Sequence, residues 1–220
     1  MRRIWRDNGL TIVLLAMFLA VFVGQILAGY RVYNHDQRDH GEAAIGLHAY
    51  LATPHFLEAT AENWESEFLQ MGIFVMLTAV LYQRGSAESR DPDGESEGDR
   101  EPDPRRPGAP AAVRRGGFVL ALYRRSLALT FYLFFLVSFG LHALGGAGAY
   151  NAEQASHGSG SRMSVVGYMG SSRFWFESFQ NWQSEFLSIA AMVVLTIFLR
   201  QQGSPESKPV DAPHSRTGTG

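Results

Sequence analysis

The chain has 220 residues, a formal net charge of −2 at pH 7 and no cysteine. Without cysteine it has no disulfide, no thiolate nucleophile and no thiolate metal site, and its net charge argues neither for nor against a nucleic-acid partner. Very apolar stretches alternate with segments made mostly of Arg, Asp, Glu, Gly, Pro and Ser, a segregation that soluble domains seldom show.

The first half of the chain is predicted to cross a membrane twice. Residues 10–29 carry no charge, and a helix of about 20 residues spans about 30 Å, the thickness of a hydrocarbon core. We do not expect a signal peptide here, because the apolar run is too long and no good A-x-A cleavage site follows it. A shorter apolar run at residues 68–82 is long enough if its helix begins near Trp64, in an aromatic-rich interface. We therefore expect residues 1–84 to form one two-helix membrane unit.

The second half of the chain repeats this plan. An uncharged run covers residues 126–151, and a shorter apolar run covers residues 186–199, with its helix expected to begin near Trp182. Between the halves the chain is rich in Pro, Gly, Ser and mixed charge, a composition that cannot bury a core. The expected divisions that follow are a disordered linker at residues 85–117, a second two-helix unit at residues 118–202 and a disordered tail at residues 203–220.

The distribution of basic residues predicts the orientation of the chain. The N-terminus, the linker and the tail hold most of the arginines and the one lysine. The other two loops hold only Arg31, Arg38, Arg162 and Arg173. Because Arg and Lys concentrate on the cytoplasmic side, we expect a multi-pass protein of the inner (plasma) membrane with both termini and the linker in the cytoplasm.

An internal duplication is the strongest signal in the sequence. NWESEFL at residues 63–69 recurs as NWQSEFL at residues 181–187, a shift of 118, and YNHDQRDHG at residues 33–41 recurs as YNAEQASHG at residues 150–158, a shift of 117. One inserted residue in the second of these loops reconciles the two shifts. Because each copy holds two spans, both enter the membrane in the same sense. The expected fold is therefore all-α, a bundle of four transmembrane helices from a parallel tandem repeat.

Local signals mark where the second helix of each copy begins and ends. Thr53 and Ser171 precede helix-compatible segments and are predicted N-caps. Gly85 and Gly203 are predicted C-terminal stops, each followed by the same Ser-x-Glu-Ser pattern.

Several polar residues are expected near or within the membrane. They are Asn63, Glu67 and Gln70 in one helix stripe, Asn181 and Glu185 in its repeat, and Gln25 and His142 at matching positions of the first and third spans. An acid at membrane depth is a functional candidate by default, but both acids lie within one turn of an interfacial tryptophan, so a structural role stays open. His142 suits an interhelical hydrogen bond as well as a ligand role. A ridge of small residues at Ala16, Ala20, Gly24 and Ala28 is expected to be a helix-packing face.

One set of loop residues suits a metal ion. His40 and His157, with Asp36 and Glu153 four residues before each histidine, provide two imidazoles and two carboxylates. Loops in water contain such residues routinely, so the metal hypothesis stands beside a neutral one. No phosphate-binding loop, dinucleotide-binding glycine pattern, nucleophile elbow or HExxH helix occurs, and no other cofactor is expected.

The repeated Asn-Trp-x-Ser-Glu-Phe string with its Gly-Ser-x-Glu-Ser exit resembles a family of bacterial membrane proteins catalogued as a domain of unknown function. The resemblance covers nearly the whole chain except the linker and tail, and implies a bacterial inner-membrane protein without an assigned catalytic residue. The first functional hypothesis is a non-enzymatic structural, accessory or sensory membrane component. The alternatives are a small transporter or channel for a proton, cation or small solute, and a membrane enzyme with an outer-face metal site. The expected partners are the lipid bilayer and a second copy or a partner membrane protein, not nucleic acid.

Overall fold

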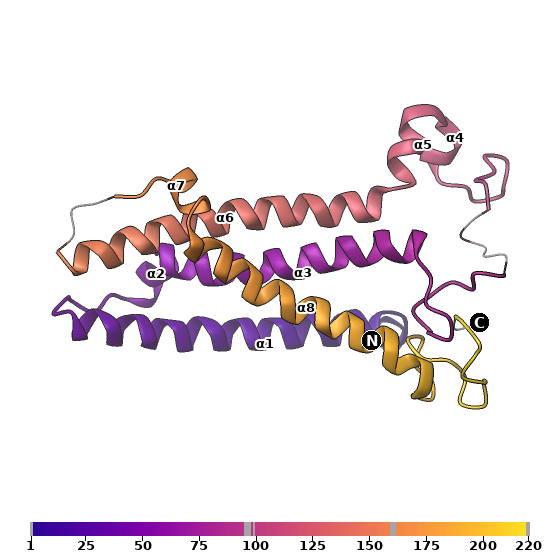
Figure 1. Ribbon diagram of the computed structural model, residues 1–220, viewed down its shortest axis with the longest axis horizontal. Coiled ribbons are helices and arrows are strands. Elements are labelled where there is room, and N and C mark those ends of the chain that lie inside the picture. Colours follow the sequence, from indigo (N-terminus) through magenta and orange to yellow (C-terminus); the bar gives the residue numbers. More distant parts are fainter. Residues whose placement is uncertain (1, 95–97, 99, 159–161, 219–220) are drawn as a thin grey trace. The chain divides into compact units, whose positions relative to one another are not determined.

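The computed structural model describes residues 2–94, 98, 100–158 and 162–218 (Figure 1). Within these residues the secondary structure is helical and no strand occurs, so the predicted all-α class is confirmed. The helices are α1 (Arg2–Asp39), α2 (Leu47–Tyr50), α3 (Pro54–Val80), α4 (Ala111–Arg115), α5 (Gly117–Tyr123), α6 (Ser126–Ser156), α7 (Val165–Met169) and α8 (Ser172–Phe198).

Three helices of the described chain are long and apolar enough to cross a membrane. They are the segments Arg3–Asp39, Ser126–Ser156 and Ser172–Phe198, in α1, α6 and α8. The fourth expected span, α3, is also 27 residues long, but its first half carries Glu58, Glu62, Glu65 and Glu67. These acids shorten its apolar part, so length and composition alone support three spanning helices and not the predicted four.

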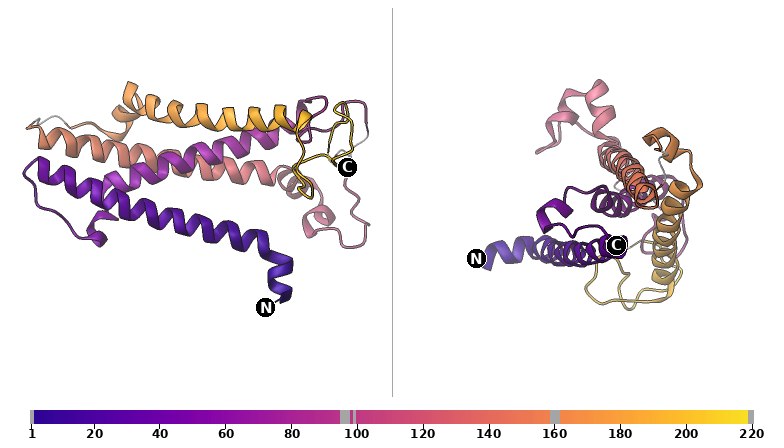
Figure 2. Two further views of the ribbon diagram at one scale, coloured as in Figure 1. Left: turned by 90° about the horizontal axis from the view of Figure 1, so that it is seen from below. Right: turned by 90° about the vertical axis from the view of Figure 1, so that its left-hand side faces the viewer.

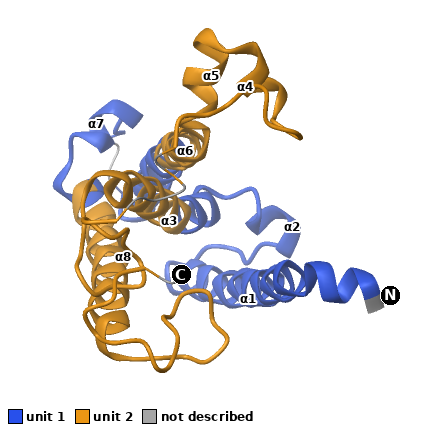
Figure 3. Ribbon diagram, turned by 90° about the vertical axis from the view of Figure 1, so that its right-hand side faces the viewer, with its two compact units in different colours: residues 1–61, 140–174 blue, residues 62–139, 175–220 orange. Residues whose placement is uncertain are grey.

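The chain divides into two compact units, shown in different colours in Figure 3. Unit 1 comprises residues 1–61 and 140–174, and unit 2 comprises residues 62–139 and 175–220. Each unit therefore contains residues from both sequence repeats. The repeat, linker and tail boundaries expected from the sequence, and the disorder expected of the linker and tail, stay predictions; residues 95–97, 99, 219 and 220 lie outside the described residues.

Unit 1 contains the same loop closure twice. Near the end of α1, the Asn34 side chain accepts a hydrogen bond from Ile45 N (2.7 Å) and donates one to Ile45 O (3.1 Å). Near the end of α6, the Asn151 side chain likewise accepts a hydrogen bond from Met163 N (2.7 Å) and donates one to Met163 O (2.9 Å). In the first copy this closure turns the chain back so that α2 lies beside α1 (Figure 2). Two repeat-related asparagines therefore make the same pair of hydrogen bonds, Asn34 to Ile45 and Asn151 to Met163.

The end of each loop packs a buried tyrosine against a glycine. Tyr50 and Tyr168 are 2% and 0% exposed, and a Cβ added at Gly29 or Gly146 would overlap the respective tyrosine side chain. Since any other residue would displace these rings, the glycines are required by close approach. The next helix of each copy then begins at the predicted caps, where Thr53 Oγ1 accepts from Phe56 N (3.2 Å) and Ser171 Oγ accepts from Phe174 N (3.3 Å).

Unit 2 contains a second duplicated structure, the exit turn that follows α3 and α8. Gly85 and Gly203 adopt φ values of 86° and 83°, the left-handed region in which glycine carries no Cβ penalty. In the first turn, Ser89 Oγ accepts from Gln83 N (2.8 Å) and Ser86 Oγ accepts from Glu88 N (3.1 Å). The corresponding bonds of the second turn, from Gln201 N to Ser207 Oγ and from Glu206 N to Ser204 Oγ, measure 2.9 and 3.2 Å. The repeated Ser-x-Glu-Ser pattern thus specifies a repeated turn.

The described part of the tail packs against the first exit turn within unit 2. Lys208 is 1% exposed, and its Nζ donates to the carbonyl oxygens of Gly85, His214 (3.0 Å) and Arg216 (2.9 Å). Gly85 N in turn donates to Thr217 Oγ1 at 2.9 Å. The single lysine of the chain thereby connects the exit of the first copy to the tail of the second.

Candidate functional site

A cavity of about 610 Å³ in unit 1 collects charged residues of both copies. The acids that the sequence placed in loops lie in the last turns of α1 and α6, and His40 and His157 directly follow these helices. The lining consists of Val32, Tyr33, Asp36, Gln37, His40, Pro54, His55, Glu58, Ala149, Ala152, Glu153, Ser156, His157 and Arg173. The four residues that the sequence suggested as metal ligands, Asp36, His40, Glu153 and His157, all lie in this lining.

The lining is built from pairs of repeat-equivalent residues. Asp36 corresponds to Glu153 and His40 to His157 by the shift of 117, and His55 corresponds to Arg173 by the shift of 118. The His40 and His157 rings approach each other edge-on, with centroids 5.3 Å apart. The cavity therefore combines equivalent side chains from the two copies.

The candidate metal ligands are close together but are engaged with other groups. Asp36 Oδ1 lies 3.5 Å from His40 Nδ1, which also contacts the Asp36 carbonyl oxygen at 2.9 Å. Glu153 forms an ion pair with Arg173, at 2.6 Å between Oε2 and Nη1. Among the described residues, no group of three or more His, Asp or Glu side chains is arranged to hold a metal ion. The metal hypothesis stays a prediction, which elemental analysis of the purified protein would test.

Two residues that sequence reasoning missed complete the electrostatics of the cavity. His55 Nδ1 is buried and has no hydrogen-bond partner among the described residues. Burial lowers the pKa of this imidazole, and the nearby Asp36 carboxylate opposes that shift. Glu58 accepts a hydrogen bond from the hydroxyl of buried Tyr168, at 3.2 Å. His55 could have been found by aligning the copies at the shift of 118, because it occupies the position of Arg173.

Unit 2 contains a different polar cluster, between α3 and α8. Glu65 is fully buried and accepts a hydrogen bond from Trp182 Nε1 at 3.1 Å. Asn181 Nδ2 donates to Glu62 Oε1. Buried Gln70 donates to Ser188 Oγ and to the carbonyl oxygen of Glu185, both at 3.0 Å. Polar side chains therefore join these two helices along much of the interface within unit 2.

The sequence singled out Glu67 and Glu185 here, but the acid at the centre of this cluster is Glu65. Glu67 is exposed and Glu185 half-buried, and the buried carboxylate belongs to Glu65, which is Gln183 in the second copy. Of the two expected asparagines, Asn181 is half-buried and takes part, whereas Asn63 is exposed. The acid that the structure buries in this helix is thus Glu65, and the roles suggested for Glu67 and Glu185 stay predictions.

The remaining expected polar residues lie in unit 1. Gln25 Nε2 donates to Thr60 Oγ1 at 3.4 Å, which is a contact between helices. His142 is fully buried and stacks on Phe174, with ring centroids 4.7 Å apart and planes 29° apart. Both arrangements are those of packing residues.

The expected small-residue ridge of α1 is exposed throughout its length, and an added Cβ at Gly24 would meet nothing within 4 Å. Close helix approach in unit 1 occurs instead at Gly145, where an added Cβ would lie 2.5 Å from Glu58 N.

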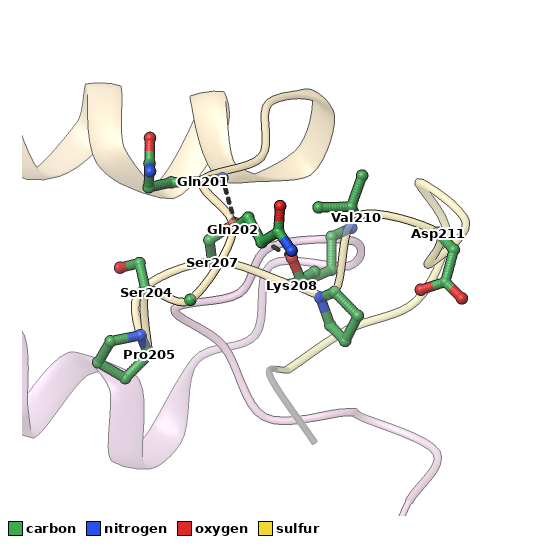
Figure 4. Close-up of a pocket in the computed structure, with 10 residues that line it drawn as sticks. Gln201, Gln202, Ser204, Pro205, Ser207, Lys208, Val210 and Asp211 are labelled. Carbon is green, nitrogen blue, oxygen red and sulfur yellow. Dashed lines mark hydrogen bonds between the residues drawn. The ribbon is translucent and has the colours of Figure 1, made fainter.

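A second hollow, of about 700 Å³, lies in the tail within unit 2 (Figure 4). Its lining comes from one continuous segment, residues 201–211, and includes Lys208 and Asp211. The hydrogen bond from Gln201 N to Ser207 Oγ crosses the turn beside it. Since one turn of chain forms the whole lining, this hollow is the inner side of that turn and brings no residues together from separate elements.

The described chain is all-α, and three of its helices are long and apolar enough to cross a membrane. These features are typical of integral membrane proteins. The chain belongs to the family described as a domain of unknown function (DUF6766), whose family model matches residues 1–219. No curated protein and no solved structure matched the chain.

Proposed function

We propose that this chain is a four-span protein of a bacterial inner membrane, with α1, α3, α6 and α8 crossing and both termini in the cytoplasm. The tandem repeat supports α3 as the fourth span, because its repeat-equivalent α8 is apolar enough to cross. The burial of Glu65 and Gln70 against α8 supports it as well, since polar groups of a membrane helix are tolerated when other helices cover them.

In this orientation the unit 1 cavity opens to the exterior, and we propose that the protein acts there as a non-enzymatic sensory or accessory component that binds a small polar solute. The observation that carries this function is the lining itself, in which both copies contribute an acid and a histidine to one cavity of about 610 Å³. Cavities of this size, with a few convergent polar groups, are typical of small-ligand sites.

A thermal-unfolding screen of the full chain in lipid nanodiscs tests this function. Small cationic, anionic and neutral solutes are added at millimolar concentration, and the expected result is a rise in the unfolding midpoint with one class. A double variant, His40→Ala with His157→Ala, is expected to lose that rise while keeping the midpoint of the ligand-free protein. A screen without any stabilising solute would contradict the function.

A second candidate, a small proton or cation transporter, is supported by the buried carboxylate of Glu65. An acid within a membrane bundle is a functional candidate because its ionised form is costly there. Proteoliposomes that contain the chain would then show a proton- or cation-dependent flux that Glu65→Gln abolishes, and Glu67→Gln, on the exposed face, is the matched control. Absence of flux with every ion tested would exclude this candidate.

A further inference from the structure

In the second copy, a cation of the chain itself, the guanidinium of Arg173, is bound by neighbouring side chains. Arg173 Nη1 lies 2.6 Å from Glu153 Oε2, and the Arg173 Cζ lies over the Tyr150 ring, 5.8 Å from its centroid. A guanidinium is therefore held between a carboxylate and the face of an aromatic ring. These two interactions, a charge-assisted hydrogen bond and a cation–π contact, are the ones by which proteins recognise guanidinium and ammonium groups.

The first copy retains the acid and the ring but lacks the cation. Asp36 corresponds to Glu153 and Tyr33 to Tyr150, whereas the position of Arg173 is taken by His55. The His55 ring meets Tyr33 edge-on, with centroids 5.4 Å apart, and within the described part of the chain its buried Nδ1 has no hydrogen-bond partner. The imidazole is shorter than the Arg173 side chain, and Tyr33, Asp36 and His55 all line the cavity.

The charges around this place favour a cation. The cavity lining contains three carboxylates, of Asp36, Glu58 and Glu153, and one guanidinium, of Arg173. With the lining histidines neutral its net charge is −2, and the Arg173 charge is already paired within the second copy. An anion would be repelled by the two carboxylates on the first-copy side.

We propose that the first-copy side of the cavity binds a small organic cation, a guanidinium or primary ammonium group, in the place that Arg173 takes in the second copy. Asp36 accepts hydrogen bonds from the cation and the Tyr33 ring covers it. The proposal rests on the proposed ligand-binding function and names the chemical class of its ligand.

The test is calorimetric titration of the full chain in nanodiscs with methylguanidinium chloride and with methylammonium chloride, each compared with sodium chloride at the same ionic strength. We expect saturable binding of one organic cation per chain and no heat of binding with sodium. Asp36→Asn should lower the affinity at least about tenfold, the factor that corresponds to the loss of one charge-assisted hydrogen bond.

Two variants that exchange the equivalent residues His55 and Arg173 test the proposal most directly. His55→Arg supplies the first copy with its own guanidinium and should abolish binding, whereas Arg173→His vacates the second site and should raise the stoichiometry from one to two. The unfolding midpoint of each variant shows whether it is folded, and because the two variants are predicted to change the stoichiometry in opposite directions, general destabilisation cannot imitate the result.

Unchanged binding in folded His55→Arg, or equal heats with sodium, would overturn the proposal. Stabilisation by an anion or a neutral solute alone would overturn the cation assignment and leave the proposed ligand-binding function standing. If no solute of any class binds, both fail.

Discussion

The indole Nε1 of Trp182 donates a hydrogen bond to the fully buried carboxylate of Glu65, at 3.1 Å. The repeat-equivalent tryptophan, Trp64, is 39% exposed, and the residue equivalent to Glu65 is Gln183, which is also exposed. The two copies of one motif therefore perform different structural roles.

This asymmetry predicts unequal effects of equal substitutions. Trp182→Phe removes a donor from a buried carboxylate and should lower the free energy of unfolding by about 1–3 kcal/mol. Trp64→Phe, at the exposed equivalent, should change it by less than about 0.5 kcal/mol. Denaturant unfolding of both variants in the same detergent measures the difference, and equal effects would show that the Glu65 contact contributes no stability.

Glycine substitutions should separate the close helix contact of α6 from the open ridge of α1. In Gly145→Ala the added methyl group meets the α3 backbone, so overpacking should cost about 1–3 kcal/mol of stability. In Gly24→Ala it meets nothing within the described chain, and helix propensity alone should make the variant slightly more stable. The two unfolding midpoints are the measurement, and loss of stability in Gly24→Ala would show that a partner covers the ridge.

Much of this fold follows from the sequence repeat. The N-caps at Thr53 and Ser171 are confirmed, because each depends on local chemistry that one residue specifies. The predicted stops at Gly85 and Gly203 are wrong in position: α3 ends at Val80 and α8 at Phe198, and the two glycines supply the left-handed backbone of the turns that follow. The acids and histidines of the candidate metal site also converge in space, as a duplication with equivalent segments implies.

What the sequence could not determine is how each helix is rotated about its axis. The segment around Trp64 carries acids on two faces, so periodicity allowed Glu67 to be chosen where the structure buries Glu65. Residues that are identical in the two copies do not point to His55, because the second copy has arginine, Arg173, at the equivalent position. The proposed cation site rests on one such difference between equivalent positions.

Binding of an organic cation in the unit 1 cavity should depend on pH through His55. Burial lowers the pKa of His55, so the imidazole is neutral at pH 7 and gains a charge as the pH falls through that lowered value. A charged His55 competes for Asp36, and methylguanidinium affinity should therefore fall on acidification.

The other charged and titratable groups around His55 are those that line the cavity: Tyr33, Asp36, His40, Glu58, Glu153, His157 and Arg173. His55→Gln is the control: titration calorimetry should show a weaker pH dependence in this variant. An unchanged pH profile would show that the dependence does not arise from His55.

The exit turns should loosen as the pH rises. Burial raises the pKa of Glu88, as do the charge of Glu206 and a hydrogen bond to it. Above the unfolded-state pKa the folded turn retains a proton that the open chain releases, so this stabilisation disappears as the pH rises through the folded-state pKa. Hydrogen-exchange protection of Gln83 and Gln201, corrected for intrinsic rates, should decline over that interval. Glu88→Gln should flatten the dependence, whereas Glu42→Gln, at an exposed loop position, should leave it unchanged.

Lys208→Met should release the tail from the first exit turn. It removes three hydrogen bonds from a charged donor to carbonyl oxygens, and the loss of even one corresponds to about tenfold faster local opening. Hydrogen exchange at Gly85 and Gly218 should speed up, with no change in the amides of α6. If these amides exchange at the open-chain rate in the unsubstituted protein, the disorder predicted for the tail is correct and the packed tail is not populated.

The number and direction of the spans can be decided by labelling, because the chain has no cysteine of its own. Ser156→Cys and Gln202→Cys each introduce one thiol, the first in the lining of the cavity and the second in the exit turn after α8. With four spans and a cytoplasmic N-terminus, a membrane-impermeant maleimide added to intact cells should label Ser156→Cys and reach Gln202→Cys only after permeabilisation. If α3 does not cross, the pattern reverses, and labelling of Gln202→Cys in intact cells would contradict both the four-span topology and the exterior position of the cavity.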